Sequence, residues 1–160
     1  ESKGPAIYSQ IRVGKKGKAF KMYKFRSMTA DAEMKTGPVW ATKKDSRITK
    51  VGNFLRTSHL DELPQFLTVL RGEMSLVGPR PERPYFVREF RKIIPHYDRR
   101  LCAKPGITGL AQIKRSYDES IADVKKKLKY DVLYISKMCP LLDLKVVFMT
   151  ALTVVLRTGR

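Results

Sequence analysis

Two adjacent carboxylates, Asp61 and Glu62, are the residues of this sequence best suited to chemistry. An acidic pair at the start of a helix can also simply cap backbone N–H groups. Arg56 lies shortly before the pair, and the proline-rich segment 78–84 adds two more arginines, one of them Arg80. Arginine binds phosphate oxygens with paired hydrogen bonds, and a metal held by a carboxylate offsets the remaining charge. The combination indicates phosphoryl chemistry, although a segment rich in proline could equally be a structural connector.

The composition is that of a globular protein with an unusual charge. The 160 residues include 33 Lys and Arg but only 15 Asp and Glu, a net charge of +18 that favours nucleic acid, anionic lipid or phosphorylated substrates as partners. The chain has the size of one domain. Cys102 and Cys139 stand apart, with no Cys-x-x-Cys or His-rich cluster, which argues against a disulfide scaffold and a zinc site. We expect both to be buried thiols in a reducing compartment.

The N-terminal third predicts a β-hairpin followed by less regular structure. Residues 7–13 and 19–25 partly alternate between apolar and polar side chains, and they flank the sequence Gly-Lys-Lys-Gly at 14–17, which is typical of a hairpin turn. Residues 27–35 are compatible with a helix that a glycine and a proline would end. Residues 37–46 read as a polar loop.

Two helices are expected around the acidic pair. Apolar residues recur at helical spacing from position 46 onward, at Ile48, Val51, Phe54 and Leu55. A second helix is expected over 61–71, because this start places Pro64 in the first turn, where proline is tolerated. A cap at Ser58 would instead leave Pro64 in the helix interior.

The C-terminal half contains further helices and one stiff loop. Glycine and prolines make 74–84 a rigid, irregular loop, and a helix should run from residue 84 to just before Pro95. Residues 104–113 fit a loop or a short strand, and an apolar stripe predicts a long helix over 121–138. The apolar stretch 141–156 is shorter than the roughly 20 residues needed to cross a bilayer. It is either a helix buried against the domain or one that lies in the lipid interface.

Five segments follow one another as an ordered set of motifs. They are GPAIYSQIRVGKKGKAFKMYKFRSM at 4–28, DSRITKVGNFLRTSHLDELPQF at 45–66, GEMSLVGPRPERP at 72–84, KPGITGLAQI at 104–113 and KLKYDVLYISKMCPLLDLK at 127–145. Together they cover nearly the whole chain. The sequence resembles the bacterial sugar transferase family, the monotopic phosphoglycosyl transferases that start polysaccharide and glycoconjugate assembly on polyprenyl phosphate.

The resemblance implies roles for the residues that match the family's motifs. Asp61 matches the nucleophile and Glu62 the carboxylate that holds Mg²⁺, while Arg56 matches an arginine placed to bind phosphate. Within the Pro79-Arg80-Pro81 motif, Arg80 is expected near the nucleotide or diphosphate. We also expect Lys24 and Arg26, from the KFR element, to bind substrate. Where many relatives have Asn-Gly-Arg, this chain reads Lys-Arg-Ser-Tyr at 114–117, a region expected to touch the substrate.

The implied enzyme transfers a sugar-1-phosphate from a UDP-sugar to polyprenyl (undecaprenyl) phosphate through a phospho-aspartyl sugar, and it releases UMP. This is the first membrane step of polysaccharide or glycoconjugate synthesis, at the cytoplasmic face of the bacterial inner membrane. The implied partners are the UDP-sugar, the lipid phosphate and an anionic membrane surface, and a homo-oligomer is left open. We expect residues 1–160 to form a single catalytic domain that lacks the family's N-terminal membrane hairpin.

We expect a mostly helical α+β fold, in which an N-terminal β-hairpin packs beside amphipathic helices that share a membrane-facing side. Two other functions compete with the enzyme. A basic nucleic-acid-binding module is supported by the charge alone, because neither an RNP-like nor a zinc-finger pattern occurs, and we expect no specific nucleic acid partner. A catalytically inactive scaffold with the same fold is disfavoured by the complete set of Asp61, Glu62, Arg56 and Arg80.

Overall fold

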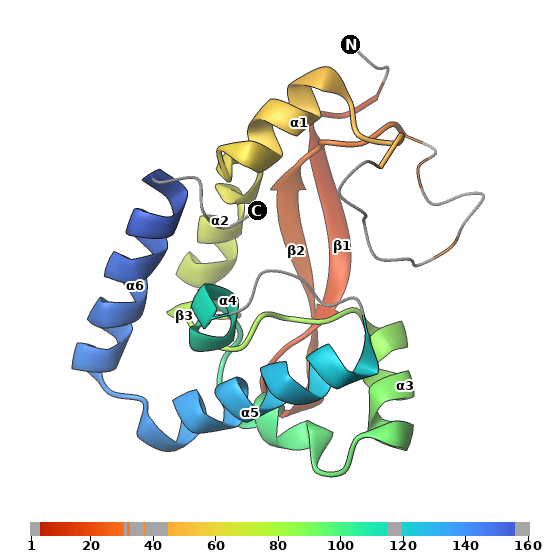
Figure 1. The fold of residues 1–160 in the computed structure, drawn as a ribbon. Helices are drawn as coiled ribbons and strands as arrows, with labels where there is room; N and C mark the ends of the chain where they lie inside the picture. The colour runs from red at the N-terminus through yellow and green to blue at the C-terminus, as the bar shows by residue number, and fades with distance from the viewer. Residues whose placement is uncertain (1–3, 31, 33–36, 38–44, 115–119, 156–160) are drawn as a thin grey trace.

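The N-terminal β-hairpin is the longest regular element of the first third of the chain (Figure 1). The computed structural model describes the chain apart from residues 1–3, 31, 33–36, 38–44, 115–119 and 156–160. Strand β1 (Ile7–Val13) pairs antiparallel with β2 (Ala19–Phe25), as the alternation predicts. The turn is a short 3-10 helix, η1 (Lys15–Gly17), in which Lys16 and Gly17 adopt positive φ angles of 56° and 78°. The mostly helical α+β fold is confirmed.

The helix predicted over 27–35 is wrong where the structure describes it. Residues 27–30 are not helical, and Met28 instead forms an antiparallel bridge with Ile48. Most of the rest of that prediction, and most of the loop predicted over 37–46, lies outside the described residues. Helix α1 (Lys50–Thr57) begins later than expected, because Thr49 caps it by accepting a 2.9 Å hydrogen bond from the backbone N–H of Gly52.

The helix predicted to begin at Asp61 is also displaced. A 3-10 turn, η2 (Leu60–Glu62), carries the acidic pair, and helix α2 (Gln65–Leu70) begins only after Pro64. His59, just before η2, adopts the left-handed conformation with φ 58°. The sharp change of direction at His59 and the missing N–H of Pro64 separate the acidic pair from the following helix.

A second, two-stranded sheet lies inside the segments expected to be irregular. Strand β3 (Ser75–Val77) runs parallel to β4 (Gly106–Thr108), so the expectation of an irregular loop over 74–84 is wrong at its start, and the short strand expected within 104–113 is confirmed. Glycines allow the two chains to approach closely, since a Cβ atom on Gly106 would lie 2.1 Å from the backbone nitrogen of Gly78. A three-residue strand leaves too little periodicity to detect in the sequence.

The remaining helices surround the hairpin and the small sheet. They are α3 (Pro84–Ile93), the 3-10 helix η3 (Tyr97–Cys102), α4 (Leu110–Lys114), α5 (Ile121–Lys137) and α6 (Pro140–Val155). The predicted helices α3 and α5 are confirmed. The largest core cluster joins the end of the hairpin to α3, η3 and α5, through Val13, Val87, Phe90, Ile94, Tyr97 and Val124. Smaller clusters pack β2 against Met74, and α5 and α6 against β3.

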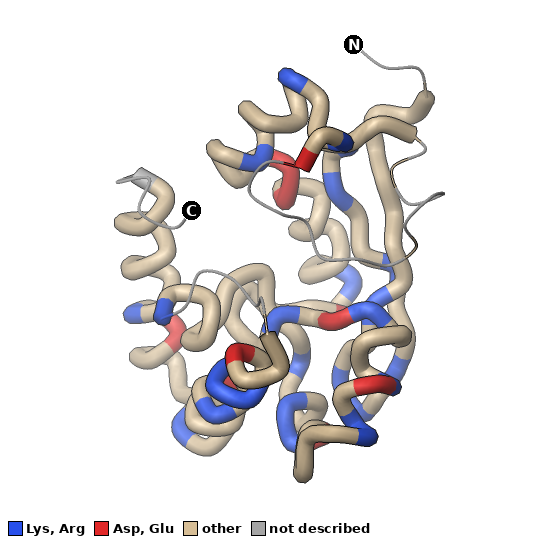
Figure 2. The backbone as a smooth tube through the Cα atoms, turned by 45° about the vertical axis from the view of Figure 1, so that its right-hand side comes forward, with Lys and Arg blue, Asp and Glu red and all other residues tan. Residues whose placement is uncertain are grey.

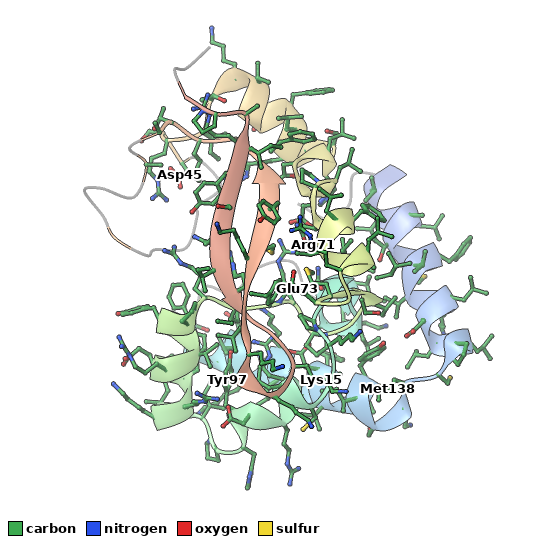
Figure 3. The ribbon with its side chains drawn as sticks, turned by 180° about the vertical axis from the view of Figure 1, so that it is seen from behind. Lys15, Asp45, Arg71, Glu73, Tyr97 and Met138 are labelled. Atoms are coloured by element: carbon green, nitrogen blue, oxygen red, sulfur yellow. The ribbon has the colours of Figure 1, made fainter. Side chains whose placement is uncertain are left out.

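Helix α6 packs on one side only, so the expectation of a helix buried against the domain holds for one of its faces. Val146 is fully buried against Val77 and Tyr134, whereas Leu141 on the outer face is 77% exposed. Many α6 side chains point away from the rest of the molecule in Figure 3. No helix in the described part of the chain is long and apolar enough to cross a membrane.

The cysteines do not behave as predicted. Cys102 and Cys139 are both exposed free thiols, so the expectation of buried thiols is wrong. Cys102 ends the short helix η3, and Cys139 lies in the connection between α5 and α6, where the chain turns at the surface.

The contact between α1 and Ser27 generates a prediction about stability. A Cβ atom on Gly52 would lie 1.9 Å from the carbonyl oxygen of Ser27, so Gly52→Ala forces α1 away from that strand end. We expect Gly52→Ala to lower the free energy of unfolding by about 1–3 kcal/mol, as overpacking does elsewhere. Chemical denaturation measures this, with Asn53→Ala on the exposed side of the same helix as the control. Equal stability of the two variants would contradict the close contact.

Candidate active site

A pocket of about 770 Å³ lies between the hairpin, the α1–η2 turn, the Pro-Arg-Pro segment and α6. It brings together seven of the eight residues predicted for the site, namely Lys24, Arg26, Arg56, Asp61, Glu62, Arg80 and Pro81. Pro79 does not line this pocket. It is buried behind Arg80, where its carbonyl accepts a hydrogen bond of 3.1 Å from the N–H of Gly106. The volume is within the range of sites for nucleotide-sized ligands.

Asp61 combines burial with an oxygen that no described residue satisfies. The residue is 4% exposed, and its Oδ1 atom is buried without a hydrogen-bond partner among the described residues. Most buried polar atoms in proteins are hydrogen-bonded, so an exception needs an explanation. The cap role weighed from the sequence does not supply one, since the N-cap of the following helix α2 is Pro64 and not Asp61. An oxygen held in a pocket wall without a partner remains available for a ligand.

Glu62 is held by two cations from distant parts of the chain. Lys24 Nζ on β2 donates to Glu62 Oε1 at 2.6 Å, and Arg80 Nη2 donates to the same oxygen at 2.5 Å. Burial alone would raise the pKa of Glu62, but Arg80 and Lys24 outweigh it and hold that pKa well below its usual range. Burial lowers the pKa of Lys24 despite the attraction of Glu62. The pair of cations therefore keeps Glu62 ionised.

The other predicted arginines line the pocket without joining this pair. Arg56 lies in the last turn of α1, half-buried, and Arg26 follows β2, where its backbone N–H donates to Ala6 O at 2.8 Å. Among the described residues, the pocket lining holds six arginines and two lysines against three carboxylates. Lys114 ends α4, while the rest of the segment 114–117, expected to touch substrate, lies outside the described residues.

A buried ionic cluster beneath the Pro-Arg-Pro segment was missed from the sequence. Glu82 binds Lys127 Nζ at 2.8 Å and lies 3.8 Å from Arg100, which pairs with Asp131 at 2.9 Å. Burial would raise the pKa of Glu82, but Lys127, Arg100 and Arg12 lower it to about 2. A buried charge is tolerated only when it is paired in this way.

One signal for this cluster was present in the sequence. Lys127 and Asp131 are four residues apart and fall on the same side of α5 as the apolar stripe that includes Val124. Lys125, Lys126 and Lys129 are exposed, so the run of lysines concealed the buried Lys127. Figure 2 shows how basic residues follow α5, whereas α6 carries few charges.

The residues of the pocket fit a divalent cation only in part. The described residues include no group of three or more His, Cys, Asp or Glu that could hold a metal ion. Mg²⁺, however, is commonly bound by one or two carboxylates together with substrate phosphates. The unsatisfied oxygen of Asp61 suits that arrangement, whereas Glu62 could bind a metal only by giving up one of its bonds to Lys24 or Arg80. The donor set fits a metal that shares its coordination with a phosphorylated ligand.

Comparison with known proteins identifies the family. The model of the bacterial sugar transferase family matches residues 1–157, and the chain belongs to this family. It is 49% identical over 93% of its length to a UDP-glucose:undecaprenyl-phosphate glucose-1-phosphate transferase of Klebsiella pneumoniae, covering 32% of that protein. It is 43% identical over 99% of its length to a UDP-N-acetylgalactosamine-undecaprenyl-phosphate N-acetylgalactosaminephosphotransferase of Aeromonas hydrophila, covering 37%. A galactosyl transferase of Streptococcus agalactiae is 46% identical over 98% of the chain and 36% of its own length. The chain thus spans about a third of the length of these relatives.

The depressed pKa of Glu82 predicts how stability depends on pH. The usual pKa of 4.5 falls to about 2 in the folded protein, so this carboxylate stabilises the fold above pH 4.5, and that stability is lost as the pH falls toward 2. Glu82→Gln leaves Lys127 and Arg100 without this partner, and we expect a loss on the order of 3 kcal/mol at pH 7.

Urea denaturation at pH 7 and at pH 3 tests this prediction. The parent protein should lose more stability between the two pH values than Glu82→Gln, because the variant lacks the titrating group. An equal loss in both proteins would show that Glu82 does not carry the acid sensitivity.

Proposed function

We propose that this protein transfers a sugar-1-phosphate from a UDP-sugar to polyprenyl phosphate through a covalent intermediate on Asp61. The observation that carries the proposal is the buried Asp61 oxygen without a partner, beside a Glu62 held by Lys24 and Arg80 in a nucleotide-sized pocket. The names of the relatives, which include undecaprenyl-phosphate transferases for two different sugars, support the reaction class and leave the sugar open.

In the first step, a carboxylate oxygen of Asp61 attacks the sugar-bearing phosphorus of the UDP-sugar. A new bond forms between this oxygen and phosphorus, the bond to the bridging oxygen breaks, and UMP leaves with that oxygen. Arg80 and Arg56 bind phosphate oxygens and offset the charge that develops during transfer. The low exposure of Asp61 keeps water away from the intermediate.

In the second step, an oxygen of polyprenyl phosphate attacks the same phosphorus. The bond to Asp61 breaks, the carboxylate is regenerated, and the product is a sugar diphosphate on the polyprenyl chain. Splitting the transfer into two steps allows one large substrate at a time to occupy the pocket. Mg²⁺ held by Glu62 and the diphosphate would supply charge neutralisation. An inactive scaffold would show neither step.

The lipid acceptor requires the pocket to lie near a membrane. Helices α2 and α6 both lie on the side of the hairpin away from α3 (Figure 1), and residues of both, Phe66 of α2 and Thr150 of α6, line the pocket. Both carry strongly exposed apolar side chains, since Leu70 at the end of α2 is 84% exposed and Leu144 and Phe148 on α6 are also exposed. We propose that these helices rest in the interface of the cytoplasmic leaflet. Thr150 and Thr153, on the other side of α6, line the pocket.

Separate substitutions of the acidic dyad, Asp61 and Glu62, distinguish the proposed nucleophile from the proposed metal ligand. Asp61→Asn keeps the size of the side chain but removes the anionic nucleophile, so turnover should fall by about 10³-fold or more while the fold survives. Glu62→Gln should weaken the Mg²⁺ dependence and slow both steps. UMP release from a panel of UDP-sugars, with Mg²⁺ and polyprenyl phosphate, measures both effects and identifies the sugar.

Intact mass spectrometry tests the covalent step directly. Full-length protein incubated with UDP-sugar and no acceptor should gain the mass of one sugar phosphate, mapped to Asp61. Normal labelling of Asp61→Asn, or turnover at the parent rate, would contradict the role of Asp61 as nucleophile.

The membrane prediction compares two sides of the molecule. Replacing Leu141 and Leu144 by Gln removes exposed apolar surface from α6, and we expect the affinity for vesicles to fall by about 10-fold or more. The matched control is Ile93→Gln, an exposed apolar residue of α3. Binding should strengthen with anionic lipid and weaken with salt. An interfacial α6 would be contradicted if the α6 variant and Ile93→Gln lost the same vesicle affinity, or if binding did not depend on lipid charge and salt.

A further inference from the structure

The backbone that carries Arg80 is bonded at four successive carbonyl groups. The donors come from three parts of the chain. Pro79 O accepts from Gly106 N at 3.1 Å and Arg80 O from Arg100 Nη2 at 2.8 Å. The end of β1 supplies the other two, with Arg12 Nη1 donating to Pro81 O at 3.0 Å and Val13 N to Glu82 O at 2.9 Å. The prolines on either side of Arg80 have no N–H to donate. The position of Arg80 is therefore determined by donors outside the segment.

Two of these four donors are guanidinium groups that are anchored at their other ends. Arg12 also donates to Gln10 Oε1 at 2.6 Å, which ties it to β1, and Arg100 donates to Tyr97 Oη at 2.7 Å. Arg100 is 4% exposed and Arg12 is largely buried. A planar guanidinium that donates to two groups holds a backbone carbonyl more firmly than the single, flexible ammonium of a lysine would.

The cluster brings like charges together at an energetic cost. Arg12 and Arg100 both approach Glu82, at 4.0 Å and 3.8 Å, and the charge of Arg80 also acts on Arg12. Burial lowers the pKa of Arg12 to about 10, which still leaves the group charged at neutral pH. Buried ionic groups often stabilise a fold no better than apolar side chains of similar volume would. Stability alone therefore does not explain why charged donors hold this segment.

We propose that Arg12 and Arg100 are positioning residues that hold the backbone of Arg80 so that its guanidinium remains on Glu62 and faces the pocket. Arg80 reaches Glu62 with two nitrogens, Nη2 at 2.5 Å and Nη1 at 3.3 Å, a geometry that a shift of the backbone would lose. The effect on the Arg80–Glu62 pair is independent of the reaction. The effect on a diphosphate ligand rests on the function proposed above.

The first experiment observes Arg80 without any substrate. Arginine side-chain Nε–Hε signals are recorded by NMR for ¹⁵N-labelled parent protein, and the Arg80 signal is identified by its loss in Arg80→Gln. In Arg12→Gln the Arg80 signal should shift and exchange faster with solvent, and in Arg12→Lys it should move only part of the way. The control is Arg91→Gln, which removes an exposed arginine of α3 that pairs with Asp98 of η3. It should leave the Arg80 signal unchanged. An unchanged Arg80 signal in Arg12→Gln would overturn the proposal.

Arg100 is tested in the same way with a conservative change. Arg100→Lys keeps the charge beside Asp131 but cannot bond Tyr97 and the carbonyl of Arg80 together. We expect it to displace the Arg80 signal as Arg12→Gln does. If this buried substitution prevents folding, as a thermal melt would show, the Arg12 variants still decide the proposal.

The second experiment tests whether Arg12 acts through Arg80. KM and kcat for a UDP-sugar are measured for the parent, Arg12→Gln, Arg80→Gln and the double variant. Arg12→Gln should raise KM by about 10-fold, the size expected for a lost hydrogen bond to a charged group, and should add little in the Arg80→Gln background. The same factor in both backgrounds would overturn the proposal. A parent protein without UMP release would refute the proposed function, and the NMR experiment would still decide the positioning role.

Discussion

The ion pairs of Glu62 with Lys24 and Arg80 connect three parts of the chain that are distant in sequence. Placing a carboxylate in a largely buried position is costly unless cations compensate it, so the hairpin and the Pro-Arg-Pro segment both have to reach η2. The register of the hairpin makes this possible. Phe20 and Met22 are buried on one face of β2, and the alternation of side chains places Lys24 on the same face. A slip of one residue would move all three to the opposite face.

Elements with a strong internal pattern could be predicted from the sequence. The hairpin, α3 and α5 each combine a periodic run of apolar residues with a turn residue or a proline at an end. The predictions failed where a tertiary contact decides the outcome. Residues 27–30 bridge to Ile48 instead of forming a helix, and β3 exists because β4 lies beside it. The acidic pair lies in a separate turn because His59 adopts a left-handed conformation that no local pattern announces.

The site was predicted in a different way from the fold. Composition and spacing indicated only that Asp61 and Glu62 lie near arginines, and the family motifs added Lys24 and Arg26. The structure brings these residues into one pocket, with Pro79 behind it. The cluster of Glu82, Lys127, Arg100 and Asp131 was not predicted, because ion pairs between residues so far apart in sequence depend on how α5 crosses beneath the segment that follows β3. Single charged residues reveal their partners only after the chain has folded.

At the acidic pair itself, Asp61 and Glu62 are offset by Lys24 and Arg80, while the rest of the described pocket lining is positively charged. The whole chain carries a charge of +18, part of which lies on exposed lysines such as Lys125, Lys126 and Lys129 of α5. Long-range attraction for an anionic substrate therefore originates outside the dyad, and the dyad itself contributes short, directional bonds. Salt in the surrounding solution screens the first of these far more than the second. Under the proposed function, substrate capture and chemistry therefore respond to ionic strength as two separate properties.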